Sequence, residues 1–132
     1  MSKSLIYMAN TNAQALAIGG VVNFGSVVRR FGCNLKSTGT TPQTEGVGYY
    51  SIDTNITLTA AAAGTVTLTL FKDGVPITGA TQSATVVANS IYAFNVPAVI
   101  REQCCNKTSI ITLVITGVAT TVNNAAIEVE KK

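Results

Sequence analysis

Alternation of apolar and polar residues in two segments is the feature that most constrains how this chain can fold. Within residues 50–58 the apolar side chains recur on one face of an extended chain: Tyr50, Ile52, Ile56 and Leu58. The intervening polar side chains occupy the other face: Ser51, Asp53, Asn55 and Thr57. Residues 65–71 repeat this pattern. Because successive side chains of a strand point to opposite faces, both segments are predicted to be half-buried β-strands.

The rest of the chain also favours strands over helices. No segment shows apolar residues at helical spacing over three turns. Asp73-Gly74 tolerates the positive φ angles of a type I′ turn and predicts a hairpin there. Further strands are predicted at 5–8, 21–28, 31–35, 81–88, 91–99, 109–116 and 125–130, and a surface loop at 36–43. The prediction is an all-β jelly-roll sandwich of about eight to ten antiparallel strands.

Composition narrows the class of protein. The 132 residues suit a single domain, and 47% hydrophobic residues argue against disorder. Only 11% of the residues are charged, which suggests that a partner or copies of the chain itself cover part of a neutral surface. A net charge of +3 without a basic stripe argues against nucleic-acid binding. No apolar run reaches the ~20 residues of a membrane span, and the N-terminus lacks the features of a secretory signal.

The side chains that carry most enzyme chemistry are scarce. There is no histidine, which removes the commonest general base and most zinc sites. Glu128 and Glu130 would share one face of the last strand, about 7 Å apart, a separation that could suit a glycosidase. The simpler interpretation is a solvated strand face that ends in Lys131-Lys132. We therefore expect a protein that is not an enzyme and needs no cofactor or metal.

Three cysteines leave several arrangements open. They are Cys33, Cys104 and Cys105. An odd number leaves at least one thiol outside any pair within the chain, and adjacent cysteines rarely bond to each other. The alternatives are a disulfide from Cys33 to Cys104 or Cys105, crosslinks between subunits, or buried free thiols that behave as small apolar residues.

Two consecutive arginines stand out in so neutral a chain. Arg29 and Arg30 would point to opposite faces of a strand. One of them could pair with a carboxylate such as Glu102, across a subunit boundary. The alternative is a solvated edge strand whose charges block pairing between sheets.

Three stretches resemble a known superfamily. Gly46-Val47-Gly48-Tyr49-Tyr50 is similar to a strand entry of the tumour-necrosis-factor and complement-globular-head superfamily. Residues 70–79 resemble a hairpin of its bacterial members, and residues 115–117 and 126–131 resemble its last two strands. The nearest likeness is to the C-terminal domain of the collagen-like glycoprotein of the bacterial spore exosporium. Similar modules occur among phage and prophage structural proteins.

This resemblance implies a compact homotrimer without a catalytic centre. It also implies that Tyr50, with Tyr92 and Phe94, lines the trimer axis. Because no collagen stalk is present, we expect a structural protein that decorates or caps a phage capsid or fibre, located in the virion and bound to a larger protein scaffold. The alternatives are a head that binds a receptor or cell-surface glycan, and a spore- or cell-surface protein.

The resemblance covers residues 21–132, which we assign to the jelly-roll domain. The segment of residues 1–20 lies outside it and carries Leu5, Ile6 and Tyr7. Two roles are open for this segment: an anchor to the scaffold, or the first strand of the sandwich.

Overall fold

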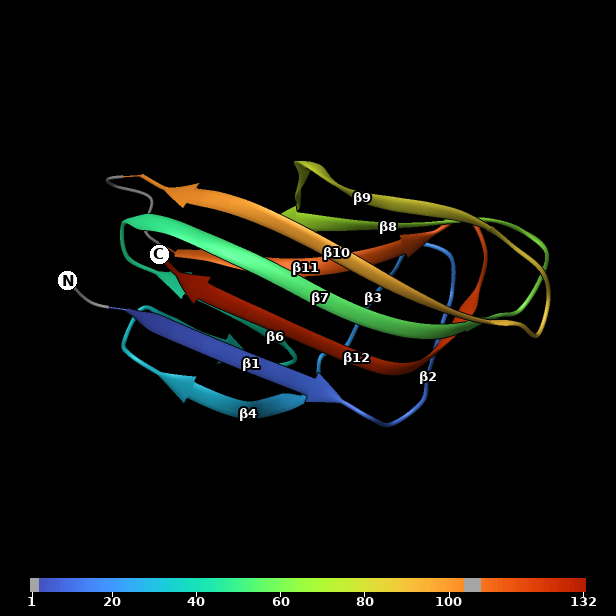
Figure 1. The fold of residues 1–132 in the computed structure, drawn as a ribbon, viewed down its shortest axis with the longest axis horizontal. Helices are drawn as coiled ribbons and strands as arrows, with labels where there is room; N and C mark the ends of the chain where they lie inside the picture. The colour runs from blue at the N-terminus through green and yellow to red at the C-terminus, as the bar shows by residue number, and fades with distance from the viewer. Residues whose placement is uncertain (1–2, 104–107) are drawn as a thin grey trace.

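Two antiparallel sheets lie face to face in the computed structural model, which describes residues 3–103 and 108–132 (Figure 1). The first sheet has the order β10-β7-β12-β1-β4, with β2 added to β12. Its strands are β1 (Ser4–Asn10), β2 (Gln14–Leu16), β4 (Ser26–Phe31), β7 (Gly48–Ala60), β10 (Ile91–Glu102) and β12 (Thr120–Lys131). The second sheet has the order β5-β6-β11-β8-β9, with β3 added to β11. Its strands are β3 (Gly20–Val21), β5 (Leu35–Thr38), β6 (Thr41–Glu45), β8 (Gly64–Lys72), β9 (Val75–Val86) and β11 (Thr108–Thr116).

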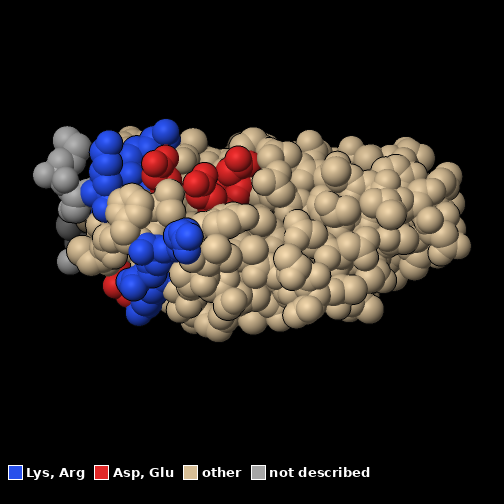
Figure 2. Space-filling model, turned by 60° about the horizontal axis from the view of Figure 1, so that its bottom comes forward, with Lys and Arg blue, Asp and Glu red and all other residues tan. Residues whose placement is uncertain are grey.

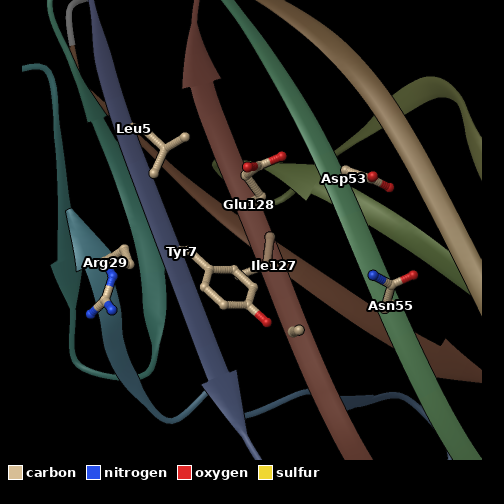
Figure 3. Close-up of a pocket in the computed structure, with 8 residues that line it drawn as sticks. Leu5, Tyr7, Arg29, Asp53, Asn55, Ile127 and Glu128 are labelled. Atoms are coloured by element: carbon tan, nitrogen blue, oxygen red, sulfur yellow. The ribbon is translucent and has the colours of Figure 1, made fainter. Parts of the chain in front are cut away.

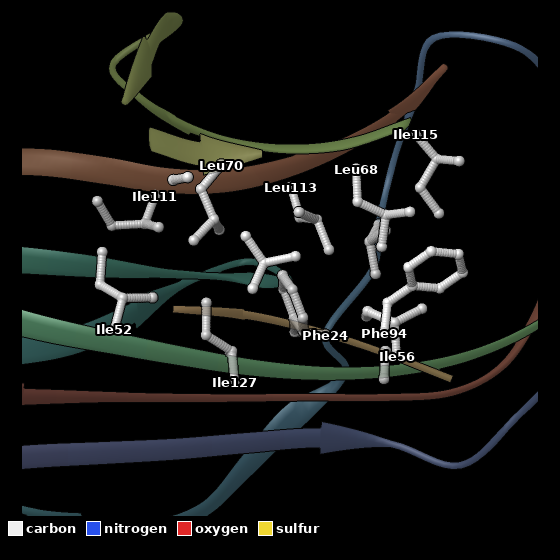
Figure 4. Packing of buried hydrophobic residues seen from close by; sticks show 14 of the residues in the cluster. Phe24, Ile52, Ile56, Leu68, Leu70, Phe94, Ile111, Leu113, Ile115 and Ile127 are labelled. Carbon is white, nitrogen blue, oxygen red and sulfur yellow. The ribbon is translucent and has the colours of Figure 1, made fainter. Parts of the chain in front are cut away.

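The core fills the space between the two sheets. Ile56 and Ile127 project from the first sheet, Leu68 and Leu113 project from the second, and Phe24 enters from the segment between β3 and β4 (Figure 4). All five are buried. Full burial of one such side chain contributes roughly 1.5–3 kcal/mol. The alternation in the sequence thus decides which residues of each strand fill the core.

The N-terminal segment contributes an internal strand. Strand β1 pairs with β12 on one side and with β4 on the other. Ile6 and Met8 of β1 are fully buried in the core, whereas Leu5 and Tyr7 point outward. Residues 4–10 are therefore part of the sandwich, and the separate role of residues 1–20 as an anchor stays a prediction.

The hairpin at Asp73-Gly74 is confirmed, and the loop at 36–43 is corrected. Asp73 and Gly74 have φ angles of 52° and 81°, both positive, and Lys72 pairs with Val75 across them. Residues 36–43 do not form a loop, because β5 and β6 pair there as a second hairpin that turns at Gly39. Threonine is common in loops but also favours strands, so composition alone misplaced this segment. In the part of the chain that the structure describes, no helix is long and apolar enough to cross a membrane.

We predict that removal of residues 1–20 abolishes cooperative unfolding, because β12 and β4 both lose the strand between them. As a finer test, Ile6→Ala should lower the free energy of unfolding by about 2–5 kcal/mol, through lost burial and a new cavity. Ile110→Ala, the same change at an exposed position of β11, is the matched control and should cost about 1 kcal/mol or less. Urea unfolding followed by circular dichroism measures all three. A truncated chain that still unfolds cooperatively would contradict this role of β1.

Candidate functional site

The outer face of the first sheet brings together side chains that are far apart in the sequence. Tyr7 of β1 is in register with Arg29 of β4 on one side and with Glu128 of β12 on the other. Glu128 is in turn in register with Asp53 of β7. Neighbouring strands lie about 4.8 Å apart, so these four residues form one row across four strands (Figure 3). We call Arg29, Tyr7, Glu128 and Asp53 the cross-strand row.

Two carboxylates in this row face each other without a cation. Asp53 and Glu128 are directly opposite on adjacent strands, an arrangement in which like charges destabilise a sheet. Glu130 follows on the same face. Within residues 3–103 and 108–132, the ion pairs are Lys36 with Glu45 and Lys72 with Glu102, so neither Asp53 nor Glu128 has a basic partner there. Neither carboxylate of the row therefore forms an ion pair within a single copy.

The cross-strand row lines an open hollow rather than an enclosed pocket. Leu5, Asn55 and Ile127 also line it (Figure 3), and Ala126 completes the lining. The described residues include no group of three or more His, Cys, Asp or Glu side chains that could hold a metal ion. An amphipathic, shallow surface of this kind suits contact with another protein surface better than enclosure of a small molecule.

Strand β4, at one edge of this sheet, is exposed along its whole length. All six of its residues are exposed, including Val28 at 45% and Phe31 at 56%. An edge strand offers free backbone groups to another chain; the apolar side chains of β4 favour such a contact, whereas Arg29 and Arg30 restrict it to a surface that accepts their charge. The edge and the neighbouring face together form the surface that most needs a partner.

On the face that Figure 2 shows, charge gathers at one end of the sandwich. In Figure 2 the charged side chains gather at the end that carries both termini, and the other half of that face shows none. The sequence explains this, because residues 54–71, 74–100 and 108–127 contain no charged residue. Exposed aliphatic side chains lie near the opposite end: Ile18 and Val87 in loops, and Ile91 at the start of β10.

Tyr50 and Phe94, which the resemblance placed at a trimer axis, lie inside the sandwich. Tyr50 is 0% exposed and Phe94 is 6% exposed, while Tyr92 is partly buried and packs against the same core. The apolar face of their strands is turned toward the second sheet, so the residues that a second copy can touch are the outward neighbours such as Tyr49 and Ser51. Tyr50 therefore stabilises the protomer itself.

The hydroxyl of Tyr50 is anchored in the turn before its strand. It donates toward two backbone oxygens, that of Gly46 at 2.9 Å and that of Glu45 at 3.1 Å. Burial raises the pKa of Tyr50 to about 12, and the negative charges of Glu102 and Glu45 add to this effect. The neutral phenol thus closes the β6–β7 turn against the core.

Glu102 is buried and has its own partners, which corrects its predicted pairing with Arg29 or Arg30. Its side chain is 0% exposed; Thr44 donates a hydrogen bond of 3.0 Å to Oε2, and Lys72 Nζ lies 3.8 Å from the same oxygen. Arg30 instead donates from Nε to the carbonyl oxygen of Leu35. A carboxylate enclosed within the protomer cannot meet an arginine of another subunit.

The cysteine prediction is only partly addressed. Cys33 lies in the turn between β4 and β5 and is exposed, so it is not one of the buried thiols considered above. Cys104 and Cys105 lie outside the described residues. The disulfide between Cys33 and either of them stays a prediction.

Solved structures share this architecture at low sequence identity. Murine APRIL matches with TM-scores of 0.68 and 0.70 in two crystal structures, at 14% identity, over 99% of this chain and all of that chain. The PRD1 vertex protein P5 matches with a TM-score of 0.61, at 14% identity, over 98% of this chain and 72% of that chain. No protein-family model and no curated protein matches the sequence.

The chain is a jelly roll. The sequence prediction of this fold is confirmed, although the described residues form twelve strands where eight to ten were expected; β2 and β3, of three and two residues, are too short to show alternation. Among the functional residues, the sequence pointed to Arg29 but not to its place in a row with Asp53 and Glu128. Only knowledge of the strand order could have revealed that row.

We predict that Tyr50→Phe lowers the free energy of unfolding by about 1 kcal/mol, because the Gly46 carbonyl oxygen loses a donor while the Glu45 oxygen keeps the one from Asn34. Tyr49→Phe, on the exposed face one residue earlier, is the matched control and should change little. The wild type should also lose stability between pH 10 and pH 12. There the unfolded chain releases the Tyr50 proton while the folded chain retains it, so rising pH favours unfolding.

Thermal unfolding of the three proteins from pH 8 to pH 12 measures both effects. The decline between pH 10 and pH 12 should be shallower in Tyr50→Phe than in Tyr49→Phe. Identical pH profiles for the two variants would contradict the assignment.

Proposed function

We propose that this protein is a non-enzymatic structural protein, a homotrimeric jelly roll that decorates or caps a larger assembly such as a phage capsid or fibre. The observation that carries the proposal is the uncovered surface formed by strand β4 and the outer face of the first sheet. Its apolar edge and its uncompensated carboxylates are both unfavourable in an isolated copy. Assembly would relieve both.

A closed ring is the simplest way to cover this surface. The edge and the face are different patches, so a contact between the edge of one copy and the face of the next is heterologous. When heterologous contacts close into a ring, both patches of every copy are covered; in an open chain of copies, one patch stays free at each end. The resemblance to trimeric superfamily members supports a ring of three.

The match to a vertex protein supports a place in a virion. That protein is named for its position in a phage particle, and it shares the fold over nearly all of this chain. In the proposed trimer the charge-free half of each copy would remain available for the scaffold. Placement on a spore or cell surface is the alternative location.

A head that binds a receptor or glycan is the second candidate. It is favoured by exposed aliphatic side chains near the charge-free end: Ile18 and Val87 in loops, and Ile91 at the start of β10. In this case the same trimer would present three neutral tips to a cell surface. Binding of the purified trimer to cells from the environment of the producing host, without phage particles present, would favour this candidate over a decoration protein.

We predict a stable trimer at micromolar concentration, with a mass about three times 13.7 kDa by light scattering coupled to size exclusion. We also expect antibodies against the folded domain to label purified phage particles from the producing strain. A strain in which the gene is deleted provides the control for labelling. A monomer in solution together with unlabelled particles would refute the proposal.

A further inference from the structure

We infer that Arg29 of each copy forms an ion pair with Asp53 and Glu128 of the next copy in the trimer. This inference rests on the proposed function, because it names the contact that holds the proposed ring together. In this arrangement, residues of the cross-strand row are the ones through which one copy recognises another. The partner is a second copy of this chain.

Charge on the outer face is complementary but unpaired within one copy. Asp53 and Glu128 are in register on adjacent strands, and no Lys or Arg of the described residues lies within 4 Å of either carboxylate. Arg29 is exposed, and the hydrogen bond found for its guanidinium goes to the backbone oxygen of its own neighbour Val28. One planar guanidinium can bridge two adjacent carboxylates, which an ammonium group does less well.

The position of Arg29 along the strands matches that of the two carboxylates. Tyr7 is in register with Arg29 and with Glu128, and Glu128 is in register with Asp53. All four residues therefore lie at the same height along the strand direction. Rotation about an axis that runs along the strands keeps each residue at its height, so Arg29 of one copy arrives level with the carboxylates of the next.

Strand β4 is also the element that can reach the face of a neighbour. It is one of the two edges of the first sheet, and its six exposed residues place apolar side chains beside Arg29, including Val28 and Phe31. On the receiving face, Leu5 and Ala126 line the hollow next to the carboxylates. Packing of these apolar groups would exclude water from the ion pair and strengthen it.

The other exposed arginine near this face is less well placed. Arg101 ends the opposite edge strand, β10, and stacks over the ring of Tyr49 with its guanidinium carbon 5.7 Å from the ring centre. It is in register with Tyr49, four residues along β7 from Asp53. At about 3.3 Å per residue, this puts it roughly 13 Å from the height of the carboxylates.

Charge reversal tests the pair. We expect Arg29→Glu and Glu128→Arg, each alone, to raise the dissociation constant of the trimer by at least about tenfold, because like charges then meet at the contact. The double variant that carries both changes should regain most of the wild-type association. The matched controls are Arg101→Glu and Glu130→Arg, which make the same charge changes off the row and should leave the trimer intact. Sedimentation equilibrium measures the wild type and these five variants.

Mixing the two single variants shows that the pair crosses the subunit boundary. Every contact between unlike copies restores opposite charges, so the mixture should reassociate in part. A ring of three always retains one contact between like copies, so recovery should remain below that of the double variant. No reassociation on mixing, together with full rescue in the double variant, would place the pair within one copy and overturn the inference.

The outcomes separate this inference from the proposed function. If the wild type is a trimer and neither single variant weakens it, the ion pair is refuted and the trimer stands. Equal weakening by the off-row controls also refutes the row assignment, because a general charge effect would then explain the result. If the wild type is a monomer, the proposed trimer and the pair both fall.

Discussion

The insertion of the last strand between β7 and β1 is the interaction on which the rest of the structure depends. Strand β12 pairs along most of its length with both neighbours, so it joins the first strand of the chain to the middle of the chain. Its inward residues, Ile127 among them, complete the core between the sheets. Its outward residue Glu128 is thereby placed between Tyr7 and Asp53. The same pairing thus creates the core and the charged row on the surface.

The outer face of the first sheet carries features that are energetically unfavourable in a single copy. Opposed carboxylates destabilise a sheet, and an uncovered apolar edge invites association. Both lie on adjoining parts of one surface, and an unpaired arginine accompanies them. Self-association in which the edge of one copy covers the face of the next accounts for all three features together. The charge-free half of the sandwich lies away from this row and leaves a neutral surface for other contacts.

Much of the fold follows from local sequence, but the burial of the aromatics did not. The strands around residues 50–58 and 65–71 were predictable from their alternation, and the Asp73-Gly74 hairpin from its turn residues. The resemblance placed Tyr50 at a subunit contact, and the alternation could not test this, because it assigns residues to a face without saying what that face meets. In the folded chain it meets the second sheet, where the phenol closes the β6–β7 turn. The threonine-rich segment 36–43 was misplaced because threonine suits exposed strands as well as loops.

The sequence by itself determined the strand class, the alternating faces of β7 and β8, and the scarcity of charge over long segments. These properties are local, since they depend on side-chain period and composition. Only the tertiary structure decided that Arg29, Tyr7, Glu128 and Asp53 share one row and that Glu102 is enclosed beside Lys72. Cross-strand neighbours come from distant parts of the chain, and their register is set by pairing across the whole sheet. The sequence therefore showed which charged residues the chain has, but it could not show that these four lie next to one another on the surface.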